Sequence, residues 1–243
     1  AAYPDKPIKL IVPYAPGGIT DNLARALADG VSRELKQPIV VDNKAGASAM
    51  IGTGMVANAP ADGYTLLMAS NGNMTVTPLV MKNLSYDPIK ALRVIAVVGE
   101  IPTVAVTNLQ TPATDLRSFA AYAKANDGKL NYASLGQGNV LYLTAKKIEG
   151  DLGVRMTEVP YKGSAPSLTA LMANDVQFYV DVLPGALPFI QSGNLNALAF
   201  PSDKRLPWLP DVPTLQESGY SAFHAASWLG WAVPAATPPE VVA

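Results

Sequence analysis

The sequence predicts an α/β protein with mostly parallel sheets flanked by helices. Apolar runs of strand length alternate along the chain with amphipathic segments of helix length, which is the pattern of βαβ units. Several of the apolar runs end in Gly, Ser, Asn or Thr just before the next helix begins. With 243 residues, 49% of them apolar and 15% charged, the chain can bury one large core or two lobes of about 100 to 150 residues each.

In the first part of the chain, apolar strands alternate with helices and polar turns. A helix over 21–35 carries Leu23, Ala26, Leu27 and Val31 on one stripe, and Gln37-Pro38 ends it. Asp62-Gly63 marks a turn before the next strand. Strands are expected at 8–12, 39–41 and 64–69, and a second helix runs through residues 56 and 57.

A long extended segment separates the first part of the chain from a second series of strands and helices. Residues 93–107 are apolar and rich in β-branched side chains, so they are expected to run out of one lobe and into another. Thr114-Asp115-Leu116 is a capped start for a helix over 118–126, which Gly128 ends. Further strands are expected at 130–133, 156–161, 176–182 and 195–200, and further helices at 140–149, 165–173 and around 187–191.

Charge and composition exclude several classes of function. The formal net charge is −1, so no basic face is available to neutralise many phosphates, and a nucleic-acid partner is disfavoured. The chain has no cysteine and one histidine, which excludes disulfides, Cys-based metal sites and cysteine nucleophiles. The sequence contains no run of 18 apolar residues, so no membrane-spanning helix is expected.

The two ends of the chain suggest export and a longer protein. Small residues at positions 1 and 2 are what a signal peptidase leaves behind, so we expect an exported protein, against the alternative of a cytosolic protein that has lost its Met. Residues 238–243 begin like a helix, with Pro at the start and Glu240 in the first turn. Only about one turn of that helix is present, so a further C-terminal helical segment is expected.

The turn from Tyr14 to Asp21 is the strongest candidate for a binding element. Its Pro16-Gly17-Gly18 sequence follows an apolar strand directly and leads into a helix that begins near Thr20. A strand, a tight turn and a helix N-terminus together present unpaired backbone N–H groups and the positive end of a dipole to an anion. The turn lacks the Lys-Ser/Thr of a P-loop, so nucleotide phosphate is not favoured there.

Other segments give less support for a catalytic site or a cofactor site. A serine hydrolase using Ser70 or Ser134 with His224 stays as the alternative, although residues 68–72 lack the first glycine of Gly-x-Ser-x-Gly and His224 is the only possible imidazole base. Residues 52–57 fit Gly-x-Gly-x-x-Ala, but they lie too far from the preceding strand for a dinucleotide turn. Metal-ligand spacing is absent from the sequence, so no metal and no cofactor are predicted.

A non-catalytic anion site remains, built from three turns. Backbone N–H groups after Pro16, Ser134 and Tyr161 could hold carboxylate oxygens. The side chains of Thr20, Ser134, Asn139 and Ser164 could add hydrogen bonds. Lys162 is the sole cation in these turns and is either a ligand contact or a solvated lysine. Asp181 either accepts from a ligand hydroxyl or amine or caps the helix at 184–186. A receptor for phosphate or sulfate is a further possibility.

The chain resembles the periplasmic substrate-binding proteins of tripartite tricarboxylate transport systems, also called the Bug family. The resemblance rests on motifs that occur in family order and are jointly specific. They are Val12-Pro-Tyr-Ala-Pro-Gly-Gly-Ile-Thr-Asp21, Val41-Asp-Asn-Lys-Ala-Gly46, Ile51-Gly52, Asp62-Gly-Tyr-Thr-Leu66, Lys129-Leu-Asn-Tyr-Ala-Ser134, Val159-Pro-Tyr-Lys-Gly-Ser-Ala-Pro166 and Leu209-Pro-Asp-Val-Pro-Thr214.

The resemblance implies a two-lobed, flytrap-like fold with two mostly parallel sheets and a hinge of two crossover segments. The implied first lobe is 1–105 plus 227–243, with further helical sequence beyond the C-terminus, and the second is 106–226. The implied function is binding of a small organic carboxylate (a di- or tricarboxylate, an aromatic acid or an acidic amino acid) in the interlobe cleft, with delivery to a membrane permease. A monomeric periplasmic protein without enzyme activity is expected.

In the family, such turns grip the carboxylate through backbone amides, hydroxyls and bound waters, without an obligatory arginine. This sequence departs from the family pattern in the segment 46–52, where two glycines are missing, and at Tyr142, where the family commonly has histidine. The predicted ligand-binding residues are Tyr14, Ala15, Pro16, Gly17, Gly18, Thr20, Asp21, Ser70, Asn71, Ser134, Gly136, Gln137, Asn139, Lys162, Gly163, Ser164 and Asp181.

Overall fold

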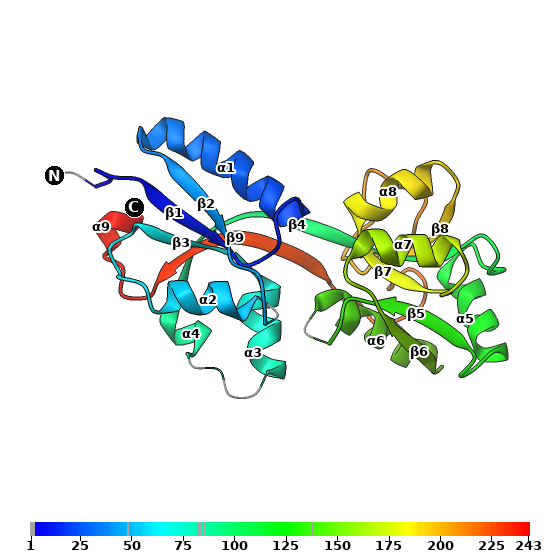
Figure 1. The fold of residues 1–243 in the computed structure, drawn as a ribbon. Helices are drawn as coiled ribbons and strands as arrows, with labels where there is room; N and C mark the ends of the chain where they lie inside the picture. Colours follow the sequence, from blue (N-terminus) through cyan, green and yellow to red (C-terminus); the bar gives the residue numbers. More distant parts are fainter. Residues whose placement is uncertain (1–2, 48, 82–83, 85, 138) are drawn as a thin grey trace. The chain divides into compact units, whose positions relative to one another are not determined.

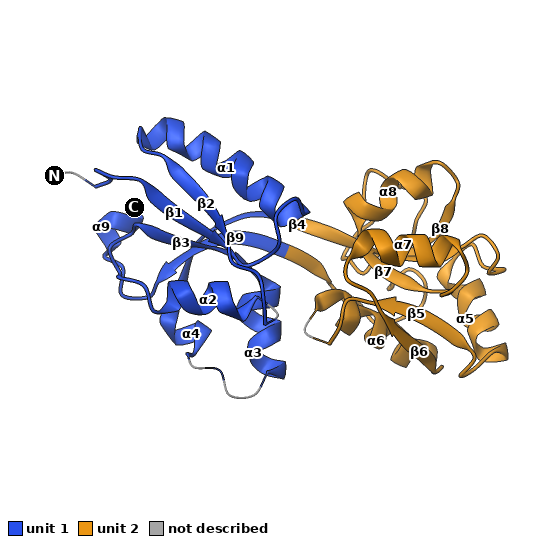
Figure 2. Ribbon diagram, in the orientation of Figure 1, with its two compact units in different colours: residues 1–99, 228–243 blue, residues 100–227 orange. Residues whose placement is uncertain are grey.

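The computed structural model describes residues 3–47, 49–81, 84, 86–137 and 139–243 (Figure 1). The chain forms two compact units, residues 1–99 with 228–243 and residues 100–227 (Figure 2). It passes between them inside two strands, β4 (Leu92–Asn108) and β9 (Ala226–Pro234). The division at residue 99 differs from the expected one at residue 105, because Thr103–Val106 of β4 pair with a strand of unit 2.

The sheet of unit 1 is built on the predicted first strand. β1 (Ile8–Val12) pairs in parallel with β2 (Ile39–Asn43) and with β3 (Thr65–Ser70). On its other side β3 pairs with β9 in antiparallel register. The side chains of β1 and β3 are nearly all buried, as expected for strands covered on both faces.

Helices cover this sheet and connect its strands. The helix predicted at 21–35 is α1 (Ile19–Leu35), which buries Ala24 and Ala28 and ends at Lys36 in a left-handed conformation. The second predicted helix is α2 (Met50–Ala57). Short helical segments that the sequence analysis did not identify follow β3 and precede β4. These are a π-helical turn (Gly72–Val76), α3 (Thr77–Val80) and α4 (Pro88–Ala91); α9 (Pro239–Val242) closes the described chain.

Unit 2 contains a second group of strands. β5 (Leu130–Ser134) and β6 (Met156–Pro160) are parallel, whereas β7 (Tyr179–Val182) and β8 (Leu195–Ala199) both pair with β4 in antiparallel register. The predicted α/β class is confirmed, but the sheets are mixed rather than mostly parallel. Among the described strands, the antiparallel pairs all involve β4 or β9. These segments carry the chain between the units without a helical crossover, so no parallel direction is imposed on them.

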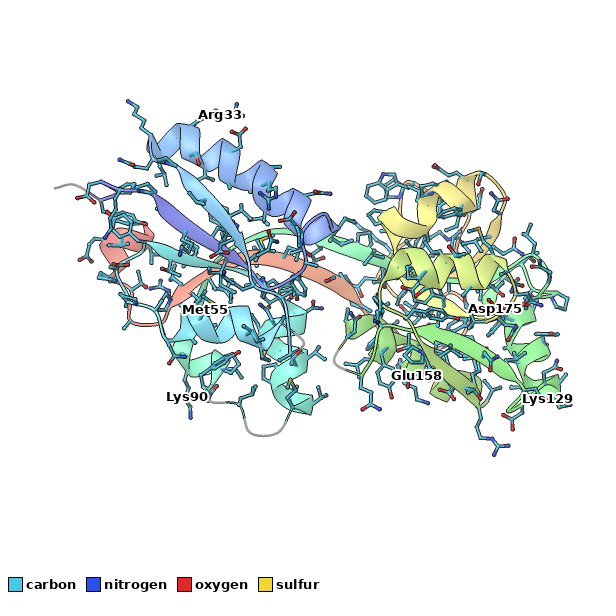
Figure 3. The ribbon with its side chains drawn as sticks, viewed as in Figure 1. Arg33, Met55, Lys90, Lys129, Glu158 and Asp175 are labelled. Atoms are coloured by element: carbon cyan, nitrogen blue, oxygen red, sulfur yellow. The ribbon has the colours of Figure 1, made fainter. Side chains whose placement is uncertain are left out.

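The described helices of unit 2 are α5 (Leu116–Ala125), α6 (Val140–Leu152), α7 (Ser164–Met172) and α8 (Leu183–Gln191). Asp115 caps α5 in a capping box with Ser118, as its sequence indicates. Phe119 and Phe178 stack in the core at 5.1 Å between ring centroids. Charged side chains such as Arg33 and Lys129 lie exposed on the two units (Figure 3). None of the helices in the described ranges is long and apolar enough to cross a membrane.

Candidate binding site

The turn between β1 and α1 is closed by a carboxylate that the sequence analysis assigned to the ligand. Asp21 is 2% exposed, and its Oδ2 accepts hydrogen bonds from the Gly17 N–H at 2.9 Å and from Arg25 Nε at 3.1 Å. Gly17 has φ +86°, which favours glycine. The Gly17 N–H, predicted as part of the anion site, is therefore engaged inside the turn.

Two residues that the sequence analysis did not single out complete this arrangement. Asn43, the last residue of β2, donates from Nδ2 to Asp21 Oδ1 at 2.9 Å and to the Tyr14 carbonyl at 3.1 Å. Arg25 donates from Nη2 to Asn43 Oδ1 at 2.9 Å. The sequence signal that could have pointed to Asn43 is a polar residue at the end of an apolar strand, within the motif 41–46. The Arg25 guanidinium, with the Gly17 N–H and the Asn43 amide, lowers the pKa of Asp21 to about 2.

The end of β3 forms a second hydrogen-bonded group in unit 1. Ser70 is 3% exposed and shares a 2.9 Å hydrogen bond with the Tyr14 hydroxyl, whose pKa is raised by burial. Asn73, fully buried, accepts from the Ser70 N–H at 2.7 Å and from Ser70 Oγ at 3.1 Å. Asn73 Nδ2 donates to Thr53 Oγ1 at 3.1 Å. The predicted contacts Tyr14 and Ser70 thus lie together, beside the half-buried Asn71.

In unit 2, the turn after β5 is organised by Ser134. Ser134 is 1% exposed, its Oγ accepts from the Gly136 N–H at 2.9 Å, and its carbonyl accepts from the Tyr161 N–H at 2.8 Å. Gly136 has φ +95°. Asn139 caps α6, because its Oδ1 accepts from the Leu141 N–H at 2.8 Å. The neighbouring Gly138 lies outside the described residues. So does Ser48, in the segment 46–52 that departs from the family pattern.

The turn after β6 brings together the other predicted contacts of unit 2. Gly163 is the N-cap of α7 and Ser164 is its first residue, while Lys162 is exposed. Ser164 Oγ donates to Asp181 Oδ2 at 2.5 Å, and the Tyr179 hydroxyl donates to Asp181 Oδ1 at 3.2 Å. Asp181 is fully buried, and burial raises its pKa. The N-cap of α8 is Val182, without a side-chain cap, so the capping role considered for Asp181 does not fit.

Exposure divides the predicted residues into two kinds. Asp21, Ser70, Ser134 and Asp181 are buried and hold the turns in shape. The others reach the surface of their own unit, in part or in full: Tyr14, Ala15, Pro16, Gly17, Gly18, Thr20 and Asn71 in unit 1, and Gly136, Gln137, Asn139, Lys162, Gly163 and Ser164 in unit 2.

Comparison with known proteins identifies the chain. The model of a family described as "Tripartite tricarboxylate transporter family receptor" matches residues 23–243. The chain belongs to this receptor family. It is a receptor rather than an enzyme, and the resemblance read from the motifs is confirmed.

Solved structures of three other proteins, each more than 30% identical in sequence, share the fold. An R. palustris protein with adipate has a TM-score of 0.88 and 34% identity, over 99% of this chain and 80% of that chain. The periplasmic binding protein BugD has a TM-score of 0.83 and 37% identity, over 99% and 80%. MatC of Rhodopseudomonas palustris with bound malate has a TM-score of 0.84 and 32% identity, over 99% and 82%. The predicted periplasmic-binding-protein fold is therefore confirmed.

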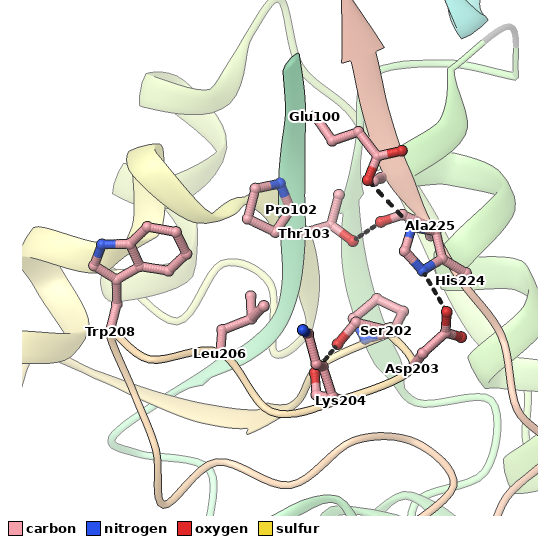
Figure 4. A pocket seen from close by; sticks show the side chains of 12 residues that line it. Glu100, Pro102, Thr103, Ser202, Asp203, Lys204, Leu206, Trp208, His224 and Ala225 are labelled. Carbon is pink, nitrogen blue, oxygen red and sulfur yellow. Dashed lines mark hydrogen bonds and ion pairs between the residues drawn. The ribbon is translucent and has the colours of Figure 1, made fainter.

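The histidine of the hydrolase alternative lies in a pocket of unit 2. His224 lines a pocket of about 300 Å³ in unit 2, where Nε2 is 3.6 Å from Glu100 Oε2 and Nδ1 is 3.4 Å from Asp203 Oδ2 (Figure 4). Ser134 is not among the residues that line this pocket. Within the described part of the chain, no group of three or more His, Asp or Glu side chains could hold a metal ion.

Proposed function

We propose that this receptor binds a small organic carboxylate through the predicted turns of both units. The proposal draws its ligand class from the neighbours, whose structures hold adipate and malate, both small dicarboxylates. Di- and tricarboxylates, aromatic acids and acidic amino acids remain the candidates, with dicarboxylates first.

The observation that carries the proposal is that the two helices beginning at these turns have N-termini without a side-chain cap. α1 and α7 have the N-caps Gly18 and Gly163, neither of which provides a side-chain cap. α2 and α8 also lack a side-chain cap, but their N-caps, Ala49 and Val182, lie outside the predicted turns. α5 and α6 are capped by Asp115 and Asn139. The first N–H groups of a helix have no intrahelical acceptor, and with the helix dipole they favour an anion. A carboxylate would supply acceptors at both positions without requiring an arginine.

Hydroxyl groups beside these N–H groups would complete the recognition. Tyr14 and Ser164 are half-buried and lie in the same turns, and each is held by a hydrogen bond to a buried partner, Ser70 or Asp181. Groups held in this way lose little conformational entropy when a ligand binds. Bound water would bridge the remaining contacts.

We infer the cellular role from family membership and the predicted export. The chain would act in the periplasm as a monomer and deliver its ligand to the membrane permease of a tripartite tricarboxylate transporter. Its net charge of −1 gives no support for a nucleic-acid partner.

Calorimetry with a panel of ligands tests the proposal. The panel contains malate, succinate, adipate, citrate, an aromatic acid and aspartate, with phosphate and sulfate as competing anions. We expect at least one carboxylate to bind and to raise the melting temperature, with a stabilisation of about 2.7 kcal/mol at a hundredfold excess over Kd. Binding of phosphate or sulfate alone would favour the inorganic-anion alternative, and binding of none would contradict the proposal.

A further inference from the structure

Among the described residues, no cation balances the buried carboxylate of Asp181. Its side chain is fully buried in β7, and no described Lys, Arg or His forms an ion pair with it. It is held by hydroxyl hydrogen bonds, from Ser164 Oγ to Oδ2 and from the Tyr179 hydroxyl to Oδ1. An acid in such a place costs desolvation energy, which points to a role beyond packing.

The role of Asp181 depends on where Ser164 directs its single hydroxyl hydrogen. A serine hydroxyl has one hydrogen to donate and lone pairs that accept. Ser164 directs its hydrogen to Asp181 over 2.5 Å, so Ser164 Oγ can only accept from other partners. The Tyr179 hydroxyl also lies within reach of Ser164, and a second lone pair of Ser164 Oγ remains for a ligand. Toward a ligand, Ser164 Oγ is therefore an acceptor, although the sequence analysis assigned it to hold a carboxylate by donation.

The surrounding chain keeps the Ser164–Asp181 pair in place. Gly185, in the first turn of α8, lies so close that a Cβ atom there would be 2.7 Å from Asp181 Oδ2 and 2.8 Å from Ser164 Oγ. Tyr179, also fully buried, fixes the other carboxylate oxygen. The hydroxyl of Ser164 thus has little freedom to turn its hydrogen toward a ligand.

Besides the acceptor Oγ, Ser164 also offers a hydrogen-bond donor. Its backbone N–H belongs to the first turn of α7, where the N-cap Gly163 supplies no side-chain acceptor. A single residue therefore presents an N–H that suits a carboxylate oxygen and, beside it, an Oγ that suits a hydrogen-bond donor.

We propose that the Ser164–Asp181 pair forms an acceptor subsite that selects carboxylates bearing a hydroxyl or amino group on the carbon next to the carboxylate. The inference rests on the proposed function, since it assigns the substituent of the carboxylate that the turns hold. A ligand without that substituent brings no donor to Ser164 Oγ, which lowers its affinity.

Paired ligands that differ by one hydroxyl group test the inference by calorimetry. Malate and succinate form the C4 pair, and 2-hydroxyadipate and adipate form the C6 pair. The pair used is the one whose chain length binds best in the ligand panel. Wild-type protein is expected to prefer the hydroxy acid by roughly tenfold or more. A Kd ratio near one in the wild type overturns the inference.

Asp181→Asn provides the sharper test because it changes the direction of one hydrogen bond with little change in shape. The Asn amide would donate to Ser164 Oγ and leave the serine hydrogen for the ligand, so the preference should fall to about one or reverse. Ser164→Ala should abolish the preference while leaving the unsubstituted acid bound. Asp175→Asn is the matched control, since Asp175 is exposed in the same unit (Figure 3), and it should keep the wild-type ratio.

The outcomes separate the inference from the proposed function. If the wild type binds no carboxylate, the proposed function fails and the inference falls with it. If carboxylates bind but the preference survives in Asp181→Asn and Ser164→Ala, the function stands and the acceptor subsite is wrong. Circular dichroism and melting curves check that each variant folds, and Ser164→Ala alone decides the question if Asp181→Asn does not fold.

Discussion

The backbone N–H of Gly17 donates a hydrogen bond to Asp21 Oδ2 over 2.9 Å, across the first turn of α1. Asp21 is buried, so this bond belongs to the turn and not to a ligand contact. The glycine N–H groups that remain for an anion are therefore fewer than the Pro16-Gly17-Gly18 sequence suggests, while the shape of the turn is fixed before any ligand arrives.

Loss of this carboxylate should destabilise unit 1. Asp21→Ala leaves the Gly17 N–H, Arg25 and Asn43 without their acceptor, and the free energy of unfolding should fall by roughly 1–3 kcal/mol. Asp29→Ala is the control on the same helix, because the Asp29–Arg33 pair is exposed and should contribute about 0.5 kcal/mol or less. Urea unfolding measures both variants, and equal losses would contradict the assigned role.

The same carboxylate should make unit 1 sensitive to acid. The pKa of Asp21 is lowered to about 2 in the folded protein, chiefly by Arg25, from its ordinary value of 3.8. Its stabilisation is therefore complete above about pH 4 and is lost as the pH falls toward 2. The difference in unfolding free energy between wild type and Asp21→Asn should shrink over this range. A difference that is constant from pH 6 to pH 2.5 would refute the prediction.

Gly185 should not tolerate a side chain, although it lies in a helix. A Cβ atom at this position meets Asp181 and Ser164, so Gly185→Ala should cost roughly 1–3 kcal/mol of stability. Gly150→Ala in α6 is the control, because its Cβ would have no neighbour within 4 Å and should stabilise the helix by about 0.5–1 kcal/mol. Thermal unfolding of both variants should give shifts of opposite sign.

The contact between β4 and β9 within unit 1 depends on Gly230. A Cβ atom there would lie 2.3 Å from the Ala96 carbonyl oxygen, and backbone cannot move aside as a side chain can. Gly230→Ala should destabilise the protein by roughly 1–3 kcal/mol or more. Gly99→Ala on β4, which would meet nothing within 4 Å, is the control. Similar unfolding midpoints for the two variants would show that the strands can separate without loss.

Replacing Lys162 shows whether this lysine contacts the ligand or is only solvated. If its ammonium group approaches the bound carboxylate, Lys162→Gln should weaken binding by roughly two- to tenfold, with a smaller effect at high salt. Lys129→Gln, at another exposed lysine of unit 2, should leave affinity unchanged. Calorimetry at two ionic strengths measures both variants, and equal affinities would assign Lys162 to solvent.

The sequence predicted local structure well where one signal dominated. Apolar strands such as 8–12 and the helix ending before Pro38 were correctly placed, because burial and backbone geometry act over a few residues. The short helices after Ser70 were missed, since Gly72-Asn73 reads as a turn until Asn73 is seen to be buried against Thr53. The antiparallel pairing of β3 with β9 was missed because it joins residues far apart in the chain.

By itself, the sequence determined the α/β class, the receptor family, and the turns that begin α1 and α7. Tertiary structure alone decided what each polar side chain in those turns does. Asp21 and Asp181 look equivalent in the sequence, as single carboxylates beside a turn. Asp21 is held by Arg25 and keeps a low pKa, whereas Asp181 is buried without a cationic partner among the described residues and orients Ser164. The difference arises from partners on other elements, and hydrogen-bond direction depends on which of them lie within reach.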